Sequence, residues 1–344
     1  MRLQTILSIP ILSQTQRFVT MLRLNLLGFL LLANSVSAFN VLVIGGTRFS
    51  GAYLWKELYD RGHDVTVYNR GKTDPKPVVR ESLDAFEARL AAAKSIKGDR
   101  KDPKQLKALI DPSKYDYVFD MNAREESDTK PLAELFVGQA SFKQYVFMSS
   151  AGVYLKSEEM PHVESDPVDP KSRHKGKLDS ENALTELGLP WCSFRPTYIC
   201  GPQNYNPVER FFFERVDAGR PVCIPGHGQH LTGLGHVEDL AVAMANVIGR
   251  EDRTTGKVYN VQNTQAITFD GVAKAAAKIV GTDSEIIHYE PKDFEFPEGK
   301  KVRFSPVWLP MMHHAVASNI MMLTPCLFFS FRHSQCDPNT SSRA

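Results

Sequence analysis

The sequence predicts an α/β fold: a doubly wound parallel Rossmann sheet with a smaller C-terminal substrate lobe. The chain has 344 residues, 42% apolar and 23% charged, which is ordinary globular composition. After residue 39, a strand, a glycine turn, a helix and a second strand follow within about 30 residues. Apolar runs of strand length then alternate with helical patterns as far as residue 195. Such alternation indicates a parallel sheet covered by helices.

The first strand–helix–strand unit carries a phosphate-binding turn. An apolar run at 40–44 precedes the turn, and a helix pattern and a strand at 64–68 follow it. Backbone N–H groups of such a turn and the helix N-terminus can bind a pyrophosphate. We therefore expect a dinucleotide to contact the turn residues Gly45, Gly46, Thr47, Arg48, Phe49 and Gly51. The glycine fingerprint expects glycine at position 48, so Arg48 either blocks part of the backbone approach or binds the phosphate itself.

The end of the second strand indicates which dinucleotide would bind. An acidic residue there usually binds the ribose hydroxyls, but this chain reads Tyr68-Asn69-Arg70-Gly71-Lys72. A missing acid and two added bases favour the 2′-phosphate of NADP over NAD, with Asn69 and Arg70 as cofactor-binding residues. The alternative is a solvated basic turn.

The remaining elements follow in order along the sheet. Helices are predicted near 82–94, 106–110, 130–137 and 177–187, and strands at 96–98, 115–121, 144–149 and 191–195. The elements become shorter after residue 196. We therefore expect a Rossmann domain over 39–195 and a C-terminal lobe over 196–301 that is interleaved with the sheet.

Residues 1–38 have the pattern of a targeting segment. A basic start near Arg23, an apolar run over 26–33 and small residues up to Ala38 predict a signal peptide, too short to span a membrane. The Ala38-Phe39 junction resembles the cleavage motif of plastid precursors in algae with secondary plastids. We expect a plastid location, with secretion as the alternative, and no membrane span in the mature chain. The five scattered cysteines are interpreted as free thiols.

The charge balance limits the class of partner. Of the 41 basic residues, three arginines lie within residues 1–38, where no acid occurs, which leaves 38 bases against 39 acids in the rest of the chain. A uniformly basic nucleic-acid binder is therefore excluded, and any site for a polyanion must be a local patch.

Several motifs together resemble the extended short-chain dehydrogenase/reductases, in the NAD-dependent epimerase/dehydratase superfamily. They are the turn at 45–49, Gly98-Asp99, and the segments 148–154, 195–202 and 235–241. Within that superfamily the chain is most similar to the chloroplast stem-loop-binding proteins, through residues 45–49, 69–72, 169–178 and 205–209. The similarity covers 40–301, whereas 302–344 departs from the family, which indicates either a gene-model error or a lineage-specific tail. The resemblance implies that Asp99 contacts the cofactor.

The same resemblance assigns the catalytic positions of the superfamily. Ser150 and Lys177 match its serine and lysine, but Arg173 stands where the proton-donating tyrosine belongs. An arginine cannot donate a proton near neutral pH, so classical dehydrogenase or epimerase chemistry is disfavoured. Tyr154, the nearby phenol, occupies a position where a structural tyrosine is common.

A run of basic residues indicates a different activity, the binding of RNA. We expect Lys171, Arg173 and Lys175 to bind RNA phosphates together with Lys72. The alternative is a solvated charge run balanced by the acids before it. The resemblance implies RNA binding in plastids, endoribonuclease activity, and association with ribosomes or transcription complexes. Base, acid and electrostatic roles in cleavage would come from His174, Lys177 and Arg173, with a divalent metal ion assisting, while Ser150 and Lys177 are the catalytic candidates that match the superfamily.

Other activities and assemblies remain open at the level of sequence. The sequence itself contains no metal-ligand cluster. The alternative functions are an NAD(P)-dependent reductase or epimerase and a non-catalytic dinucleotide-sensing scaffold. A homo-oligomer or hetero-oligomer is expected, because extended members of the superfamily commonly pair.

Overall fold

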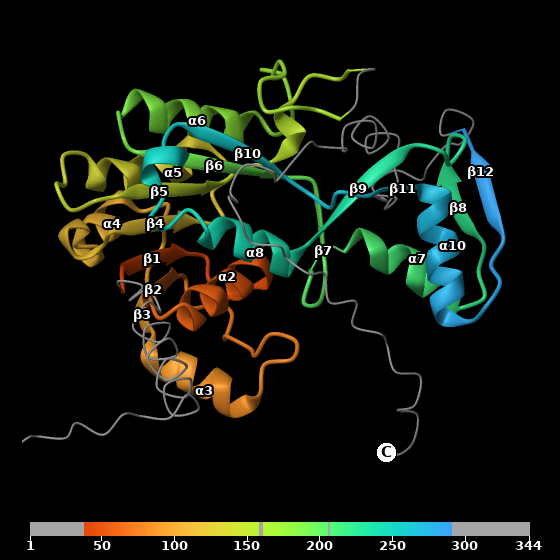
Figure 1. The fold of residues 1–344 in the computed structure, drawn as a ribbon, viewed down its shortest axis with the longest axis horizontal. Coiled ribbons are helices and arrows are strands. Elements are labelled where there is room, and N and C mark those ends of the chain that lie inside the picture. The colour runs from red at the N-terminus through yellow and green to blue at the C-terminus, as the bar shows by residue number, and fades with distance from the viewer. Residues whose placement is uncertain (1–37, 158–160, 206, 291–344) are drawn as a thin grey trace, which may run out of the picture.

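A computed structural model describes residues 38–157, 161–205 and 207–290. Its centre is a seven-stranded sheet in the order β10-β6-β5-β4-β1-β2-β3, and every neighbouring pair is parallel (Figure 1). The strands are β1 Asn40–Ile44, β2 Asp64–Asn69, β3 Lys94–Lys97, β4 Tyr117–Asp120, β5 Gln144–Met148, β6 Trp191–Pro196 and β10 Lys257–Val261. The predicted doubly wound Rossmann fold is confirmed. The targeting segment up to residue 37 and the tail over 302–344 lie outside the described residues.

Both faces of the sheet are buried, as the strand sequences require. Val41 and Val43 of β1 pack into one core cluster, whereas Leu42 and Ile44 pack into the other. This division follows from the two-residue repeat of a strand that is covered on both sides. The covering helices are α2 Phe49–Asp60, α4 Pro103–Leu109, α5 Glu126–Ala133, α6 Lys175–Glu186, α8 Val237–Ala245 and the single turn α9 Glu251–Thr254.

The small lobe lies to the right in Figure 1 and has a core of its own. It contains two sheets and two helices: β7 Tyr198–Cys200, β8 Val222–Pro225, β9 Leu231–His236, β11 Ala266–Thr268, β12 Ile286–Tyr289, α7 Val208–Asp217 and α10 Phe269–Val280. Between these elements the chain returns to the main sheet as α8 and β10. Within the described ranges, no helix has both the length and the apolar character needed to cross a membrane.

Several elements have bounds a few residues away from the sequence expectation, and for two helices a contact explains the difference. The helix expected near 130 begins at Glu126, because the Asp128 carboxylate accepts the Arg124 N–H at 2.9 Å and starts the turn earlier. The helix expected to reach Lys94, here α3 Leu83–Ala92, ends sooner, because Lys94 pairs with Thr66 in the β2–β3 ladder. The first boundary is set by a local side-chain contact and the second by strand pairing between distant segments.

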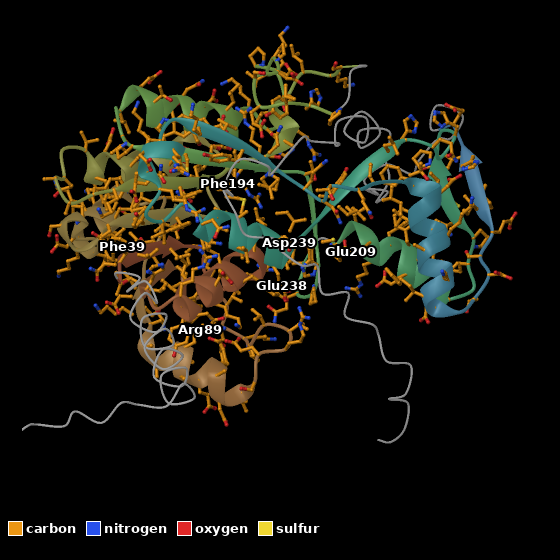
Figure 2. The ribbon with its side chains drawn as sticks, viewed as in Figure 1. Phe39, Arg89, Phe194, Glu209, Glu238 and Asp239 are labelled. Atoms are coloured by element: carbon orange, nitrogen blue, oxygen red, sulfur yellow. The ribbon has the colours of Figure 1, made fainter. Side chains whose placement is uncertain are left out.

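A buried ion pair within the segment between β2 and β3 packs that segment against helix α2. The Arg89 side chain, labelled in Figure 2, is 1% exposed and pairs with Glu81 at 2.7 Å. Its guanidinium also stacks on the Trp55 ring of α2 at 4.2 Å. Beside it, Arg80 pairs with Glu238 at the start of α8. These contacts hold the 73–93 segment over α2.

We predict that Glu81→Gln lowers the free energy of unfolding by about 3–5 kcal/mol, because it leaves the buried Arg89 charge without a counter-charge. Urea denaturation followed by circular dichroism measures this loss. Arg80→Ala, which removes the neighbouring exposed pair, is the control and should shift the midpoint far less. Equal losses in the two variants would contradict a special role for the buried pair.

Candidate nucleotide cleft

A cleft of about 690 Å³ opens at the carboxyl ends of β1, β2, β3 and β4. This is where ligands bind in open parallel sheets. Its wall includes the basic side chains Arg48, Arg70, Lys72, Arg100, Lys101, Arg124 and Lys177, and the acidic side chains Asp99, Glu125 and Asp128. The cleft therefore has a cationic excess along its wall.

The phosphate-binding turn keeps its backbone shape despite Arg48. Gly45 has φ +87°, and a Cβ on Gly51 would lie 2.2 Å from the Gly45 carbonyl oxygen, so both positions require glycine. Arg48 has φ −139°, an extended conformation that any residue adopts. Its guanidinium carbon lies 4.5 Å from the ring centroid of Tyr205, which also lines the cleft. The arginine therefore replaces the expected glycine without strain at that position.

The residues after β2 form the basic end of the cleft. The Asn69 amide oxygen accepts the Gly71 N–H at 2.6 Å, which fixes the turn. Arg70 and Lys72 are exposed, and neither has an acidic partner within ion-pair distance in the part of the chain that the structure describes. Tyr68 is buried, and its hydroxyl has no hydrogen-bond partner among those residues. This end can therefore accept a phosphorylated ribose.

The Asp99 side chain lines the cleft and also forms a hydrogen bond with the protein backbone. Its carboxylate accepts the Lys101 N–H at 3.0 Å, while its own N–H donates to Gln105. Lys101 in turn lies 3.6 Å from the Asp128 carboxylate. The predicted cofactor-binding position is thus at the cleft, within a turn of fixed shape.

A buried ion pair forms the floor of the cleft. Arg100 donates to both carboxylate oxygens of Asp120 at 2.6 and 2.7 Å, and the Tyr145 hydroxyl donates to the same carboxylate at 2.8 Å. Burial alone would raise the pKa of Asp120, but the adjacent guanidinium holds it below its usual range. Arg100 also donates to Asn122 at 2.6 Å. Local sequence does not predict this network, because Arg100 and Asp120 lie at the carboxyl ends of β3 and β4, which β1 and β2 separate in the sheet.

Lys177, which follows the basic run in the sequence, lines the cleft. Its ammonium group donates to the Met148 carbonyl oxygen and lies 5.1 Å from the Phe147 ring centroid. Burial lowers the pKa of Lys177 to about 8, and the Asp120 carboxylate opposes that shift. Lys177 therefore carries a charge near neutral pH that is lost in mild alkali.

The other candidates of this region lie beside the cleft. Ser150 accepts the Gly152 N–H at 3.2 Å, and His174 packs so tightly that a Cβ on Gly152 would lie 2.5 Å from its ring. Burial, together with the charges of Arg173 and Lys177, lowers the pKa of His174 to about 4. The imidazole is thus neutral near pH 7, and its Nε2 accepts from Arg173 at 3.0 Å.

Lys171, Arg173 and Lys175 are exposed, but they do not line the described cleft. Lys175 pairs with Asp179 at 2.5 Å. Tyr154 is buried, and its hydroxyl donates to Asn260 at 2.7 Å, so the phenol has a structural partner. The structure therefore brings Lys72 and Lys177 into one cleft and leaves the other basic candidates on an adjoining surface.

The described residues fit the phosphate and ribose parts of a dinucleotide better than its reactive end. Gly51, where only glycine fits, and Tyr68 both line that half of the cleft. In the same ranges, no group of three or more His, Cys, Asp or Glu side chains is arranged to hold a metal ion. A divalent ion therefore does not fit the described side chains, and no chemical step is assigned to one.

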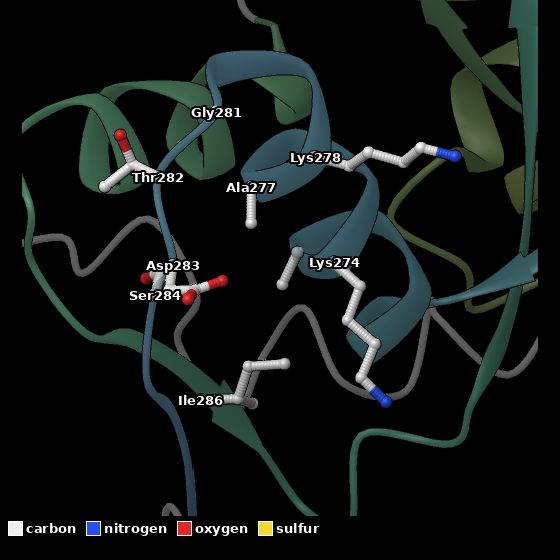
Figure 3. A pocket seen from close by; sticks show the side chains of 9 residues that line it. Lys274, Ala277, Lys278, Gly281, Thr282, Asp283, Ser284 and Ile286 are labelled. Atoms are coloured by element: carbon white, nitrogen blue, oxygen red, sulfur yellow. The ribbon is translucent and has the colours of Figure 1, made fainter.

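A second hollow lies on the small lobe. It has a volume of about 550 Å³ between α10 and the start of β12, and Figure 3 shows Lys274 and Lys278 on its helical side. Ala277 and Ile286 supply much of the remaining wall. Its lining residues belong to the small lobe, so this hollow is separate from the nucleotide cleft.

Comparisons with known proteins agree with this description. The model of the NAD dependent epimerase/dehydratase family matches residues 41–261. The chain is 46% identical over 266 residues to the chloroplast stem-loop binding protein of 41 kDa b from Arabidopsis thaliana, covering 77% of this chain and 69% of that protein.

Solved structures share the fold at lower identity. The UDP-glucose 4-epimerase of Thermotoga maritima has a TM-score of 0.60 and 21% identity, covering 77% of this chain and 88% of that one. The UDP-glucose 4-epimerase of Thermus thermophilus, in complex with NAD, has a TM-score of 0.57 and 22% identity, covering 74% and 88%. At these identities the likeness concerns the fold.

We predict that the lowered pKa of Lys177 makes stability rise with pH above about 8. Between that value and 10.5, the ordinary lysine pKa, the unfolded state keeps a proton that the folded state has lost. The free energy of unfolding therefore increases with pH in this window. Chemical denaturation at a series of pH values should show this increase in wild type and lose it in Lys177→Met. Lys175→Met is the control and should keep the wild-type slope.

Proposed function

The chain belongs to the NAD dependent epimerase/dehydratase family, and we propose that it uses this scaffold to bind RNA rather than to catalyse sugar epimerisation. One observation carries the proposal: Arg48, Arg70 and Lys72, which have no acidic partner among the residues that the structure describes, line a nucleotide cleft, and Arg173 beside it stands where the family's proton donor is expected. The name of the Arabidopsis relative, a chloroplast stem-loop binding protein, supports the same function and a plastid location.

The chemistry of the replaced position argues against a dehydrogenase. A nicotinamide cofactor supplies hydride transfer, but the substrate oxygen also needs a group that exchanges a proton. The guanidinium of Arg173 keeps its proton near neutral pH, and the Tyr154 phenol is held by Asn260. Neither residue therefore offers Lys177 a phenol to activate, and we assign to Lys177 the contribution of its charge to the cleft.

The charge distribution supports binding of a phosphate backbone. Arg48, Arg70 and Lys72 are exposed along one cleft, so they can contact successive phosphates without losing an internal ion pair. Lys171, Arg173 and Lys175 extend the cationic surface beside it. RNA held in this way is bound largely through displaced counterions, which makes its affinity depend on salt.

RNA cleavage has weaker support than RNA binding. Cleavage needs a base and an acid beside the scissile phosphate, and the titratable candidates are His174 and Lys177. With its pKa lowered to about 4, His174 is a weak base at neutral pH, and it is packed against Gly152. Lys177 holds the Met148 carbonyl. We therefore propose binding as the primary activity.

A second candidate function is binding of NADP. The specific observation is that Arg70 and Lys72 follow β2, where an acid would select NAD. Both can pair with a 2′-phosphate, and Tyr68 lines the same end of the cleft. Cofactor binding at this end needs no proton donor at position 173.

We predict that wild type binds NADP about tenfold more tightly than NAD, because contacts to a charged phosphate are strong. The double variant Arg70→Ala, Lys72→Ala should lower NADP affinity to the NAD level. Isothermal titration calorimetry measures both constants. The control is Lys104→Ala with Lys107→Ala, two exposed lysines of α4 that do not line the cleft. Equal affinity of wild type for the two cofactors would refute the 2′-phosphate assignment.

We predict that RNA affinity falls with salt and that the basic run contributes to this dependence. Each neutralised phosphate of a single strand contributes about −0.7 to the slope of log K against log salt. Replacing Lys171, Arg173 and Lys175 together by alanine should therefore flatten the slope by about two units. Fluorescence anisotropy of a labelled stem-loop RNA at several salt concentrations measures the slope.

The matched control removes three positive charges elsewhere. Lys257, Lys274 and Lys278 are exposed on β10 and on the α10 face of the second hollow (Figure 3), and their replacement should leave the slope unchanged. Circular dichroism checks that each variant is folded. Absence of RNA binding by wild type would overturn the proposed function, and an unchanged slope in the first variant would exclude the run as a contact surface.

A further inference from the structure

We propose that Tyr205 is a nucleobase-stacking residue, which holds an unpaired base of RNA beside the phosphate-binding turn. The inference rests on the proposed RNA binding and adds a residue and a mode of contact to it. Stacking on an aromatic ring, combined with a cationic groove, is how many proteins bind single-stranded nucleic acid. The loop of a stem-loop supplies such unpaired bases.

The exposure of Tyr205 is the first observation. Its side chain is 64% exposed, and it lines the cationic cleft. Of the large apolar side chains that lie exposed within the described ranges, it is the aromatic one. Single exposed apolar residues are common on protein surfaces, so exposure alone would prove nothing. The surroundings of the ring give it a specific use.

A cation covers one face of the ring. The Arg48 guanidinium carbon lies 4.5 Å from the ring centroid, and the Phe49 ring meets Tyr205 edge-on at 6.3 Å and 84°. The residue is still 64% exposed with the guanidinium over one face, and we infer that a base reaches the ring from the opposite face. A base on that face would complete a stack of base, phenol and guanidinium.

The loop that carries the ring is anchored before ligand arrives. The Gly201 N–H donates to Glu209 at 3.1 Å, and the Asn204 amide donates to the Ile199 carbonyl at 2.9 Å. Gln203 donates to the Pro77 carbonyl at 2.5 Å, which ties the loop to the segment after β2. An aromatic ring on an ordered loop loses little conformational entropy on binding, which favours a stable stack.

The backbone below the ring is also unusual. Phe49 adopts φ +41°, a left-handed conformation that is uncommon for a bulky residue, and its ring is buried. Such conformations concentrate at ligand-binding sites. The Phe49 ring lies in T-shaped contact with Tyr205. Arg70 and Lys72 on the same cleft wall can hold the phosphates on either side of the stacked base.

A nucleobase could come from RNA or from a dinucleotide, and the test separates these sources. RNA affinity is measured by anisotropy with a labelled oligouridine of about 12 nucleotides, and NADP affinity is measured by calorimetry. Tyr205→Leu removes the π-face and should weaken RNA binding about tenfold. Tyr205→Phe keeps the π-face and should stay within about twofold of wild type. NADP affinity should be unchanged in both variants.

Two further variants isolate stacking from charge and from general surface change. Arg48→Ala should flatten the salt slope by about 0.7, whereas Tyr205→Leu should leave that slope unchanged, because stacking displaces no counterion. Leu83→Ala is the matched control, since this leucine of α3 is 63% exposed and does not line the cleft. It should bind RNA as wild type does.

Cross-linking gives a readout that does not depend on a variant. RNA containing 5-iodouridine is irradiated with wild type, and a cross-link at Tyr205 supports the stack. Cross-links confined to other residues, or RNA affinity of Tyr205→Leu equal to wild type, would overturn this inference and leave RNA binding intact. A loss of NADP affinity without loss of RNA affinity would assign the ring to the dinucleotide. Wild type that binds no RNA would overturn both proposals.

Discussion

The cleft depends on one buried ion pair between the ends of two strands. Arg100 after β3 and Asp120 of β4 are almost fully buried and meet in two hydrogen bonds, and Tyr145 of β5 adds a third. A buried charge is tolerated only when its counter-charge is fixed beside it, so the pair sets the relative positions of these strand ends. The floor of the cleft is therefore neutral, while the exposed basic residues are arranged around its rim.

The two halves of the cleft differ in what they retain from the family. The turn at Gly45 and Gly51 keeps the close backbone approach that phosphate binding needs. Beside Lys177, Arg173 stands at the position that the resemblance assigns to the proton donor, and its Nε donates to the imidazole of His174. Phosphate binding serves a dinucleotide and a polynucleotide equally well, whereas proton transfer serves only the enzyme. Loss of the second property is compatible with a scaffold that binds nucleic acid.

Local sequence was sufficient for the sheet and the turn, because strand periodicity and glycine spacing are short-range signals. It was insufficient for the floor of the cleft, since Arg100 and Asp120 are joined only when β3 and β4 take their places in the sheet. The basic run illustrates a different limit. Consecutive helical residues point in different directions, so Lys177 faces the cleft while Lys175, two residues earlier in α6, pairs with Asp179 on the surface.

The hydrogen bond from Gln203 to Pro77 joins two loops that are 126 residues apart in the chain. One loop follows β2 of the main sheet, and the other precedes α7 of the small lobe. Because a chain can change loop length more easily than strand length, loops usually diverge independently of one another. Here an insertion in either loop would move the other loop as well, because the hydrogen bond joins them, and would shift the residues at the edge of the cleft. The lengths of these two loops are therefore expected to change together during evolution.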